Sequence, residues 1–358
     1  MKTVFAVSHN TTLEGPIDYL CNYLKSQGVS IKRVIHPLDN YNNRESIILG
    51  SNGISKIKRG GNMMLNLLYD TVITTQTFLK DTKSTIYIGA NSFDMLPGIL
   101  VKLIFFFKAH RLIYFASDYS EDRFDNKVLN VIYSFLETIA CKYSDLVISN
   151  TKRAALKRIK SHSLYEKKSL IIPNVASESF IPFKKKIKKT KYIYIGSINK
   201  EHGLLQYITK FGNNIHELHI LGEGDELGDI VEYCKRSKIK LVNQGRQSHK
   251  AVLDYLTTFD GIGLAPYNLL SKYTYYASPL KVYEYIAHQI PVITTDVVEI
   301  ARDIKKFHLG IVVSADTSML DLKKLLNNFH FNNFSINSDK YIKKYNRRAY
   351  YKKIIHFI

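Results

Sequence analysis

One segment decides the expected fold and most of the expected chemistry. Residues 278–285 read Ser278-Pro279-Leu280-Lys281-Val282-Tyr283-Glu284-Tyr285, and Pro291-Val292-Ile293-Thr294 follows shortly after. Pro279 suits the first turn of a helix, where its missing N–H costs no hydrogen bond. Lys281 and Glu284 are three apart and share one helical face. Free N–H groups, a positive dipole end and a lysine favour a diphosphate site. The alternative is an exposed Lys–Glu pair on a surface helix.

The same strand-and-helix alternation continues on both sides of this segment. The predicted strands are 3–8, 30–35, 85–89, 111–115 and 145–149, then 192–195, 216–221, 240–242, 261–264, 291–294 and 310–313. Amphipathic stretches separate them, which is typical of parallel sheets covered by helices on both faces. We therefore predict an α/β protein with two doubly wound, Rossmann-like domains that face a cleft. Such sheets bind ligands at the carboxyl ends of their strands.

Length and charge distribution set the expected domain boundaries. A chain of 358 residues suits two domains. The run Lys184–Lys191 is too densely charged for a core and indicates an exposed linker. We predict a first domain over 1–172, a basic linker over 173–190 and a second domain over 191–338. A C-terminal helix over 339–358 is expected to pack back toward the first domain.

Composition excludes several other classes of protein. The net charge is +20, which attracts phosphorylated substrates, anionic lipid or nucleic acid. The three cysteines, Cys21, Cys141 and Cys234, lie far apart, which argues against a disulfide scaffold or zinc site and favours the cytoplasm. The apolar run Val4–Val7 is too short for a signal peptide. The longest apolar stretch, Leu96–Phe107, is broken by Lys102 and is shorter than the ~20 residues of a membrane span.

A family resemblance adds to these patterns. The stretch SPLKVYEYIAHQIPVITTD resembles the donor-binding helix of GT-B glycosyltransferases, notably family 4 and the bacterial polysaccharide enzymes related to xanthan-type glucuronosyltransferases. YIYIGSINKEHGL, LHILGEGDE, VNQGR and FDGIGLAPY occur in the expected order. The resemblance implies that Lys281 contacts the nucleotide diphosphate and Glu284 binds the ribose. It implies a donor site formed by Gly196, Ser197, Arg246, Tyr276, Ser278, Pro279, Leu280, Lys281 and Glu284.

One departure from the family pattern bears on stereochemistry. Many retaining family-4 enzymes carry two glutamates with seven residues between them. Counting back from Glu284 gives Tyr276, which is not acidic. This favours the inverting relatives. For Gly196 and Arg246 the residues alone allow an ordinary turn and a surface arginine.

The catalytic base is expected from the first domain. Asp118 follows a predicted strand, and the resembled enzymes have an aspartate in a similar Ser-Asp context that takes the acceptor proton. The alternative is that Asp118 caps the next turn. His9 is a second candidate base in the first strand-to-helix loop. Asn10, Glu14 and Gly15 in that loop are expected on the acceptor side, and a histidine without chemistry remains the alternative.

The resemblance implies a cytoplasmic glycosyltransferase that uses a UDP-sugar and a saccharide or lipid-linked acceptor in bacterial surface polysaccharide synthesis. No DxD motif occurs, so we expect no cofactor and no essential metal. The basic-apolar regions 96–111 and 184–191 suggest peripheral contact with an anionic membrane. The alternatives are a UDP-sugar 2-epimerase of the same fold, an inactive assembly scaffold and a nucleic-acid-binding protein. No nucleic-acid-binding motif supports the last, and we expect no nucleic-acid partner.

Overall fold

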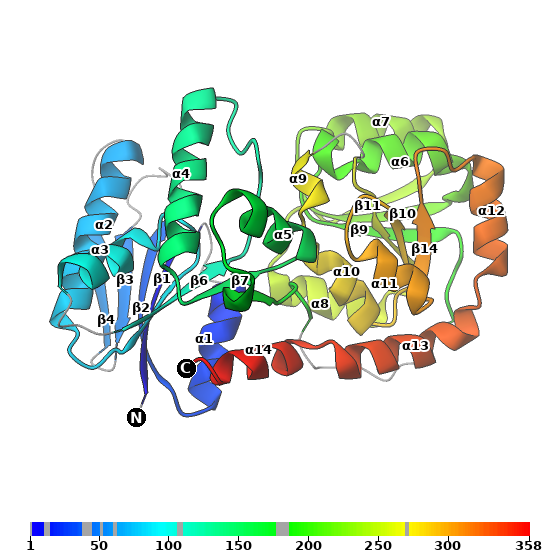
Figure 1. Cartoon of the computed structure of the whole chain (residues 1–358). Helices are drawn as coiled ribbons and strands as arrows, with labels where there is room; N and C mark the ends of the chain where they lie inside the picture. The colour runs from blue at the N-terminus through cyan, green and yellow to red at the C-terminus, as the bar shows by residue number, and fades with distance from the viewer. Residues whose placement is uncertain are drawn as a thin grey trace. The chain divides into compact units, whose positions relative to one another are not determined.

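The chain divides into two compact units (Figure 1). The computed structural model describes residues 2–10, 15–37, 45–50, 53–59, 63–105, 110–176, 186–268 and 272–358. Unit 1 contains Met1–Pro173 and Tyr350–Ile358, and unit 2 contains Asn174–Ala349.

Unit 1 is built on an eight-stranded sheet in the order β4-β3-β2-β1-β5-β6-β7-β8. Its strands are β1 (Thr3–Asn10), β2 (Ser30–Pro37), β3 (Glu45–Gly50), β4 (Gly53–Lys58), β5 (Ile86–Gly89), β6 (Arg111–Ala116), β7 (Leu146–Ser149) and β8 (Ser169–Ile171). Its helices are α1 (Pro16–Ser26), α2 (Met63–Lys80), α3 (Leu96–Ile104), α4 (Lys127–Tyr143) and α5 (Lys152–Ser161). All pairs are parallel except β2–β3 and β3–β4. This antiparallel edge was not predicted.

Apolar side chains fill both faces of this sheet. On one face Leu20 and Leu24 of α1 pack with Ile354 near the C-terminus. On the other face Phe78 of α2 and Ile99 of α3 are fully or almost fully buried. Burial of such side chains is the main source of stability, at ~1.5–3 kcal/mol for each large one.

Unit 2 has a six-stranded, wholly parallel sheet in the order β11-β10-β9-β12-β13-β14. The strands are β9 (Lys191–Ile195), β10 (Glu217–Leu221), β11 (Lys240–Asn243), β12 (Ile262–Ala265), β13 (Val292–Thr295) and β14 (Gly310–Val313). The helices are α6 (Leu204–Phe211), α7 (Leu227–Arg236), α8 (His249–Thr258), α9 (Lys272–Tyr275), α10 (Leu280–Ala287), α11 (Ala301–Lys306), α12 (Met319–Asn328) and α13 (Phe331–Lys344). The strand order reverses between β9 and β12, where doubly wound sheets bind ligands. The predicted α/β class is confirmed.

The C-terminal region differs from the single helix predicted over 339–358. It forms the end of α13 and a separate α14 (Arg347–Ile355). The helix breaks at Tyr345, and the side chain of Asn346 accepts a hydrogen bond from the N–H of Ala349 at 2.8 Å. In unit 1 the Tyr351 hydroxyl donates to the carbonyl of Pro16 at 3.2 Å. Residues 186–190, at the end of the predicted linker, belong to unit 2, where Lys188 pairs with Asp260 at 2.8 Å.

No helix among the residues that the structure describes is long and apolar enough to cross a bilayer.

Candidate functional site

Two neighbouring turns in unit 2 pack against each other at the carboxyl edge of its sheet. The N–H of Gly196 donates to Leu221 at 3.0 Å, and the N–H of Ile198 donates to Glu223 at 2.9 Å. A Cβ on Gly222 would lie 1.9 Å from the Gly196 oxygen, so a larger residue would push the turns apart. Gly196 itself has φ +114°, which other residues rarely adopt. Gly196 and Gly222 therefore allow the two turns to pack closely against each other.

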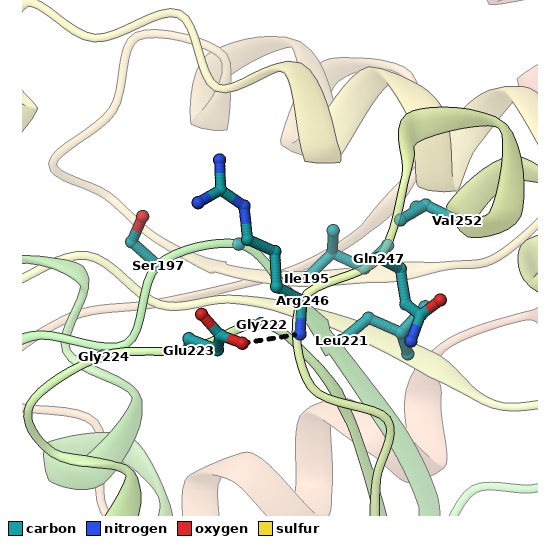
Figure 2. A pocket seen from close by; sticks show the side chains of 10 residues that line it. Ile195, Ser197, Leu221, Gly222, Glu223, Gly224, Arg246, Gln247 and Val252 are labelled. Atoms are coloured by element: carbon teal, nitrogen blue, oxygen red, sulfur yellow. Dashed lines mark hydrogen bonds between the residues drawn. The ribbon is translucent and has the colours of Figure 1, made fainter. Parts of the chain in front are cut away.

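These turns border a pocket that lies wholly within unit 2 (Figure 2). Its volume is about 590 Å³, within the usual range for small-molecule sites. The lining residues are Ile195, Gly196, Ser197, Leu221, Gly222, Glu223, Gly224, Arg246, Gln247 and Val252. Backbone groups of three turns thus meet around one cavity at the edge where α/β sheets bind ligands.

Lys281 lies beside the Gly196 turn. Its Nζ is buried and has no hydrogen-bond partner among the described residues. The ammonium lies 4.0 Å from the centre of the Tyr194 ring and 5.7 Å from that of Tyr267, and a Cβ on Gly196 would lie 3.3 Å from it. Burial lowers the pKa of Lys281 to about 7, although Glu284 acts to raise it. A buried cation that lacks a hydrogen-bond partner is stabilised when an anion binds to it.

Glu284 lies one turn further along α10 and pairs with a residue that the sequence did not suggest. Its buried Oε1 lies 2.6 Å from Nε2 of His249, the first residue of α8. The two residues are 35 positions apart, and no spacing signal links them. The pair places a carboxylate and an imidazole together next to Lys281, a polar set suited to hydroxyl groups.

The other residues predicted on this segment have structural contacts. Ser278 is buried, and its Oγ accepts a hydrogen bond from the N–H of Asn174 at 3.0 Å. The helix begins at Leu280, so Pro279 is the residue before the helix and not part of its first turn. Tyr276 is buried, and its ring meets that of Tyr275 edge-on at 5.1 Å.

The turn after β11 contributes Arg246 to the pocket wall. Gly245 has φ +62°, and the N–H of Arg246 donates to Oε1 of Glu223 at 3.4 Å (Figure 2). The Arg246 side chain is exposed to solvent. Ser197 is also exposed, and its carbonyl accepts hydrogen bonds from the Tyr194 hydroxyl and from His202. These contacts fix the backbone of the turns.

In unit 1, Asp118 lies just past the end of β6. The residue is exposed to solvent, yet desolvation by the protein around its carboxyl raises the pKa of Asp118, while Arg123 and Arg158 act to lower it. The buried Arg158 donates to the carbonyl of Asp118 at 3.0 Å and pairs with Glu137 at 2.6 Å. Asn126, and not Asp118, caps α4. Asp118 therefore has a backbone fixed by Arg158 and a carboxyl group whose hydration the surrounding protein reduces.

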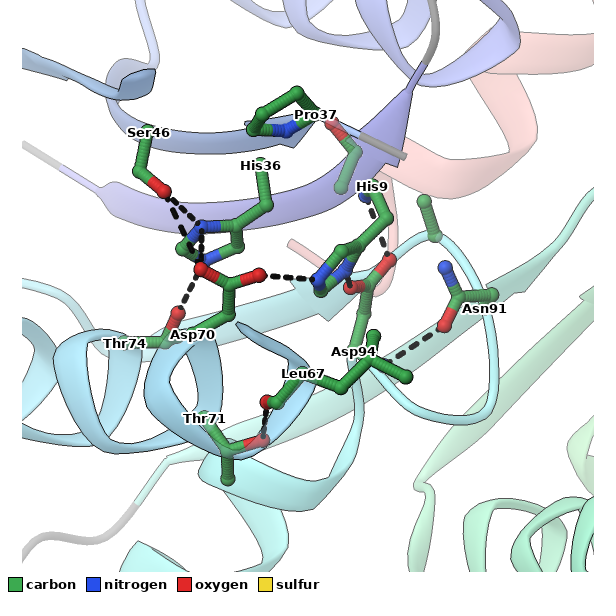
Figure 3. Close-up of polar contacts among 12 residues, drawn as sticks. His9, His36, Pro37, Ser46, Leu67, Asp70, Thr71, Thr74, Asn91 and Asp94 are labelled. Atoms are coloured by element: carbon green, nitrogen blue, oxygen red, sulfur yellow. Dashed lines mark hydrogen bonds and ion pairs between the residues drawn. The ribbon is translucent and has the colours of Figure 1, made fainter. Parts of the chain in front are cut away.

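His9 has a different setting from the loop position expected for it. It lies within β1 and is buried (Figure 3). Its Nδ1 lies 2.5 Å from Asp94 and its Nε2 lies 3.2 Å from Asp70. Burial disfavours the charged ring, but the two carboxylates outweigh it and raise the pKa of His9 to about 9. Because both nitrogens face carboxylates and the ring is a cation at neutral pH, this geometry does not favour a base.

A wider polar cluster surrounds His9 (Figure 3). Asp70 also accepts from Arg59 at 3.1 Å and lies 3.1 Å from Nδ1 of His36. His36 in turn reaches Thr74 at 2.8 Å. Every member of this cluster thus has polar partners, which is the usual condition of buried polar groups.

The remaining predicted residues of the first loop are only partly described. Gly15 precedes α1, and its carbonyl accepts from the N–H of Asp18 at 2.9 Å. The side chain of Asn10 and the whole of Glu14 lie outside the described residues. Within the described ranges, no group of three or more His, Cys, Asp or Glu residues could hold a metal ion.

Comparison with known proteins adds family information. Residues 193–356 match the family model for the glucosyltransferase 3-like, C-terminal domain. No curated protein sequence matches the chain.

Solved structures resemble the chain over its whole length. The lipopolysaccharide outer core galactosyltransferase WaaB has a TM-score of 0.67 and 15% identity, with coverage of 99% of this chain and 98% of its own. Sucrose-phosphate synthase from Thermosynechococcus elongatus has a TM-score of 0.76 and 12% identity, covering 100% and 98%. Anabaena HepE in complex with UDP-glucose has a TM-score of 0.68 and 10% identity, covering 100% and 99%. At these identities the likeness shows a shared fold.

Proposed function

We propose that the chain is a glycosyltransferase of the GT-B fold that transfers a sugar from a UDP-sugar to a saccharide or lipid-linked saccharide acceptor. The observation that carries this proposal is the buried ammonium of Lys281, which has no hydrogen-bond partner among the described residues and faces the Gly196 turn. A nucleotide diphosphate supplies the anion that this cation lacks. A structure that resembles the chain over its whole length, Anabaena HepE, was solved with UDP-glucose, which supports the choice of nucleotide.

The proposed donor spans the pocket of unit 2. Its diphosphate lies between Lys281 and the backbone N–H groups of the turns at Gly196 and Gly222. Its ribose hydroxyls donate to Glu284, which His249 already orients at 2.6 Å. Arg246, at the pocket wall, lies on the nucleobase side.

We assign the base to Asp118. Its carboxylate takes the proton of the acceptor hydroxyl, whose oxygen bonds to the anomeric carbon of the sugar. The bond between that carbon and the diphosphate breaks at the same time and the nucleoside diphosphate leaves, a single displacement that inverts the configuration. The raised pKa of Asp118 makes it a stronger base than an ordinary aspartate. Lys281 and backbone N–H groups stabilise the charge of the leaving diphosphate, so the reaction is proposed to need no metal.

The proposed setting is the cytoplasmic face of a bacterial membrane. Two structures that share the fold are the lipopolysaccharide outer core galactosyltransferase WaaB and WaaG, a glycosyltransferase involved in lipopolysaccharide biosynthesis. A chain of net charge +20 is attracted to anionic lipid, the surface on which a lipid-linked saccharide would be held. We therefore propose a lipid-linked acceptor.

A nucleotide panel tests the donor site. UDP, GDP, ADP and CMP are added to the chain and its melting is followed. UDP is expected to stabilise it most, by about 2.7 kcal/mol at a hundredfold excess over its Kd. The variant Asp118→Asn should keep this stabilisation and lose transfer from UDP-sugar, while the exposed control Asp125→Asn keeps both. If no nucleotide stabilises the wild type, the donor-site proposal fails, and full activity of Asp118→Asn removes that residue from the reaction.

A further inference from the structure

Three neighbouring helices of unit 1 expose apolar side chains on their outer side. α3 packs against both α2 and α4 (Figure 1). The exposed large apolar residues of the three helices are Leu65, Leu68, Tyr69, Val72, Leu100, Leu103, Ile104, Val128, Val131, Ile132 and Phe135. We call this set the outer apolar surface. Most soluble monomers expose no contiguous apolar patch beyond a few hundred Å².

The spacing of these residues is regular within each helix. On α4 they stand at positions 128, 131, 132 and 135, and on α2 at positions 65, 68, 69 and 72. On α3 they stand at 100, 103 and 104. Residues at i, i+3, i+4 and i+7 form a single stripe along a helix. Each of the three helices therefore carries a second apolar stripe besides the one that it buries in the core.

The charges of these helices are distributed unevenly. Their two acidic residues are buried and paired, Asp70 with Arg59 and Glu137 with Arg158. The other charged residues of the three helices are Lys80, Lys102, Lys127 and Lys142, of which Lys102 pairs with Asp145 at 2.9 Å. Asp122 and Asp125 precede α4 and limit the surface at that end. The solvent-facing sides of these helices therefore carry apolar stripes and lysines but no acidic residue of the helices themselves.

We propose that the outer apolar surface binds the surface of an anionic lipid bilayer. Apolar side chains enter the boundary of the acyl chains, while lysines contact the lipid phosphates. A symmetric contact with a second copy would instead bring the same lysines together. The proposal rests on the proposed function for its purpose, a lipid-linked acceptor, but it requires no transfer activity.

This surface differs from the one expected from sequence. Of the predicted segment 96–111, Leu100, Leu103 and Ile104 belong to it. The stripes of α2 and α4 had no predicted role. In the other predicted region, Lys184 and Lys185 lie outside the described residues.

Vesicle co-sedimentation of the full chain tests the proposal. The probes are vesicles of phosphatidylcholine mixed with phosphatidylglycerol, and vesicles of phosphatidylcholine alone. The test variant is V131S/F135S, whose two positions are 69% and 63% exposed. The matched control is L320S/I336S in unit 2, at 69% and 57%. We expect the wild type and the control to bind the anionic vesicles, and the test variant to bind at least about tenfold more weakly.

Several outcomes would overturn the proposal: no binding by the wild type, equal binding to both vesicle types, or equal losses in test and control variants. A wild-type dimer that V131S/F135S converts to monomer, without vesicle binding, would assign the surface to a second copy. Circular dichroism and melting check that each variant is folded. If UDP fails to stabilise the chain while vesicle binding remains sensitive to V131S/F135S, the proposed donor fails and the membrane surface stands.

Discussion

Each unit holds a buried basic side chain near the carboxyl ends of parallel strands, but the charge has carboxylate partners in unit 1 and no hydrogen-bond partner among the described residues in unit 2. In unit 1, His9 lies between Asp94 and Asp70, and its pKa rises to about 9. In unit 2, the Nζ of Lys281 has no hydrogen-bond partner among the described residues, and its pKa falls to about 7. A buried charge is costly unless it is paired. We infer that the paired charge serves the fold, whereas the other is kept for a ligand.

The largest expected effect comes from breaking the paired site. Asp70→Asn removes the carboxylate that faces His9, His36 and Arg59. Removing one partner of a buried ion pair costs about 3–5 kcal/mol, so unit 1 should lose that much unfolding free energy. The affinity of the chain for UDP should stay within a few-fold, since the pocket lies in unit 2. Urea unfolding and calorimetric titration measure the two quantities.

The control for this change is a half-buried aspartate at the surface. Asp339 pairs with Lys343 on the surface of α13 at 2.8 Å, and such pairs contribute ~0–1 kcal/mol. Asp339→Asn should therefore change stability by less than about 1 kcal/mol. A similar cost for Asp70→Asn would show that the cluster around His9 is not held by its charges.

The converse change is made at Lys281. Lys281→Met keeps an apolar stem of similar length and removes the charge. A charge-assisted hydrogen bond contributes about 1.5–3 kcal/mol, so UDP should bind roughly 10- to 150-fold more weakly. The unfolding free energy of the ligand-free protein should not decrease, because a buried charge without a hydrogen-bond partner is removed. If Lys281→Met instead destabilised the protein as strongly as Asp70→Asn, Lys281 would be a structural residue.

The exposed control Lys305→Met on α11 should leave both UDP affinity and stability near the wild-type values. Surface substitutions away from special contacts usually change stability by less than about 0.5 kcal/mol.

The two sites also show which features could be predicted from the sequence and which could not. The two doubly wound sheets followed from alternating strands and helices. The place of Lys281 at the start of a helix followed from Pro279 and from the spacing to Glu284. Neither pattern carries information on contacts between distant segments. The pairing of His249 with Glu284, and of His9 with Asp94 and Asp70, joins residues 35 to 85 positions apart. The hairpin β3–β4 was missed because β4 is largely exposed and lacks the buried apolar run that marks the other strands.

The last expected effect is a pair of opposite pH dependences. The folded-state pKa of His9, about 9, exceeds the ordinary 6.5, so its contribution to stability is present below pH 6.5 and is lost as pH rises through 9. The folded-state pKa of Lys281, about 7, is below the ordinary 10.5. Here the unfolded chain binds the extra proton, so the stability of ligand-free unit 2 rises between pH 7 and 10.5. The two units should therefore respond to alkali with opposite sign.

The pH dependence of UDP affinity measures the protonation of Lys281 most directly. The diphosphate binds the protonated Lys281, so above pH 7 binding must take up a proton, and the affinity should fall up to about tenfold between pH 7 and 8. The last ionisation of the phosphate, near pH 6, lies below this window. Three of the groups near Lys281 do not titrate there: burial and Lys281 lower the pKa of His202 to about 4, and burial raises those of Tyr194 and Tyr285 above 10. Titration calorimetry in buffers of different ionisation enthalpy measures the uptake. Lys281→Arg stays charged and should bind UDP without this slope, and an equal slope in that variant would place the proton elsewhere.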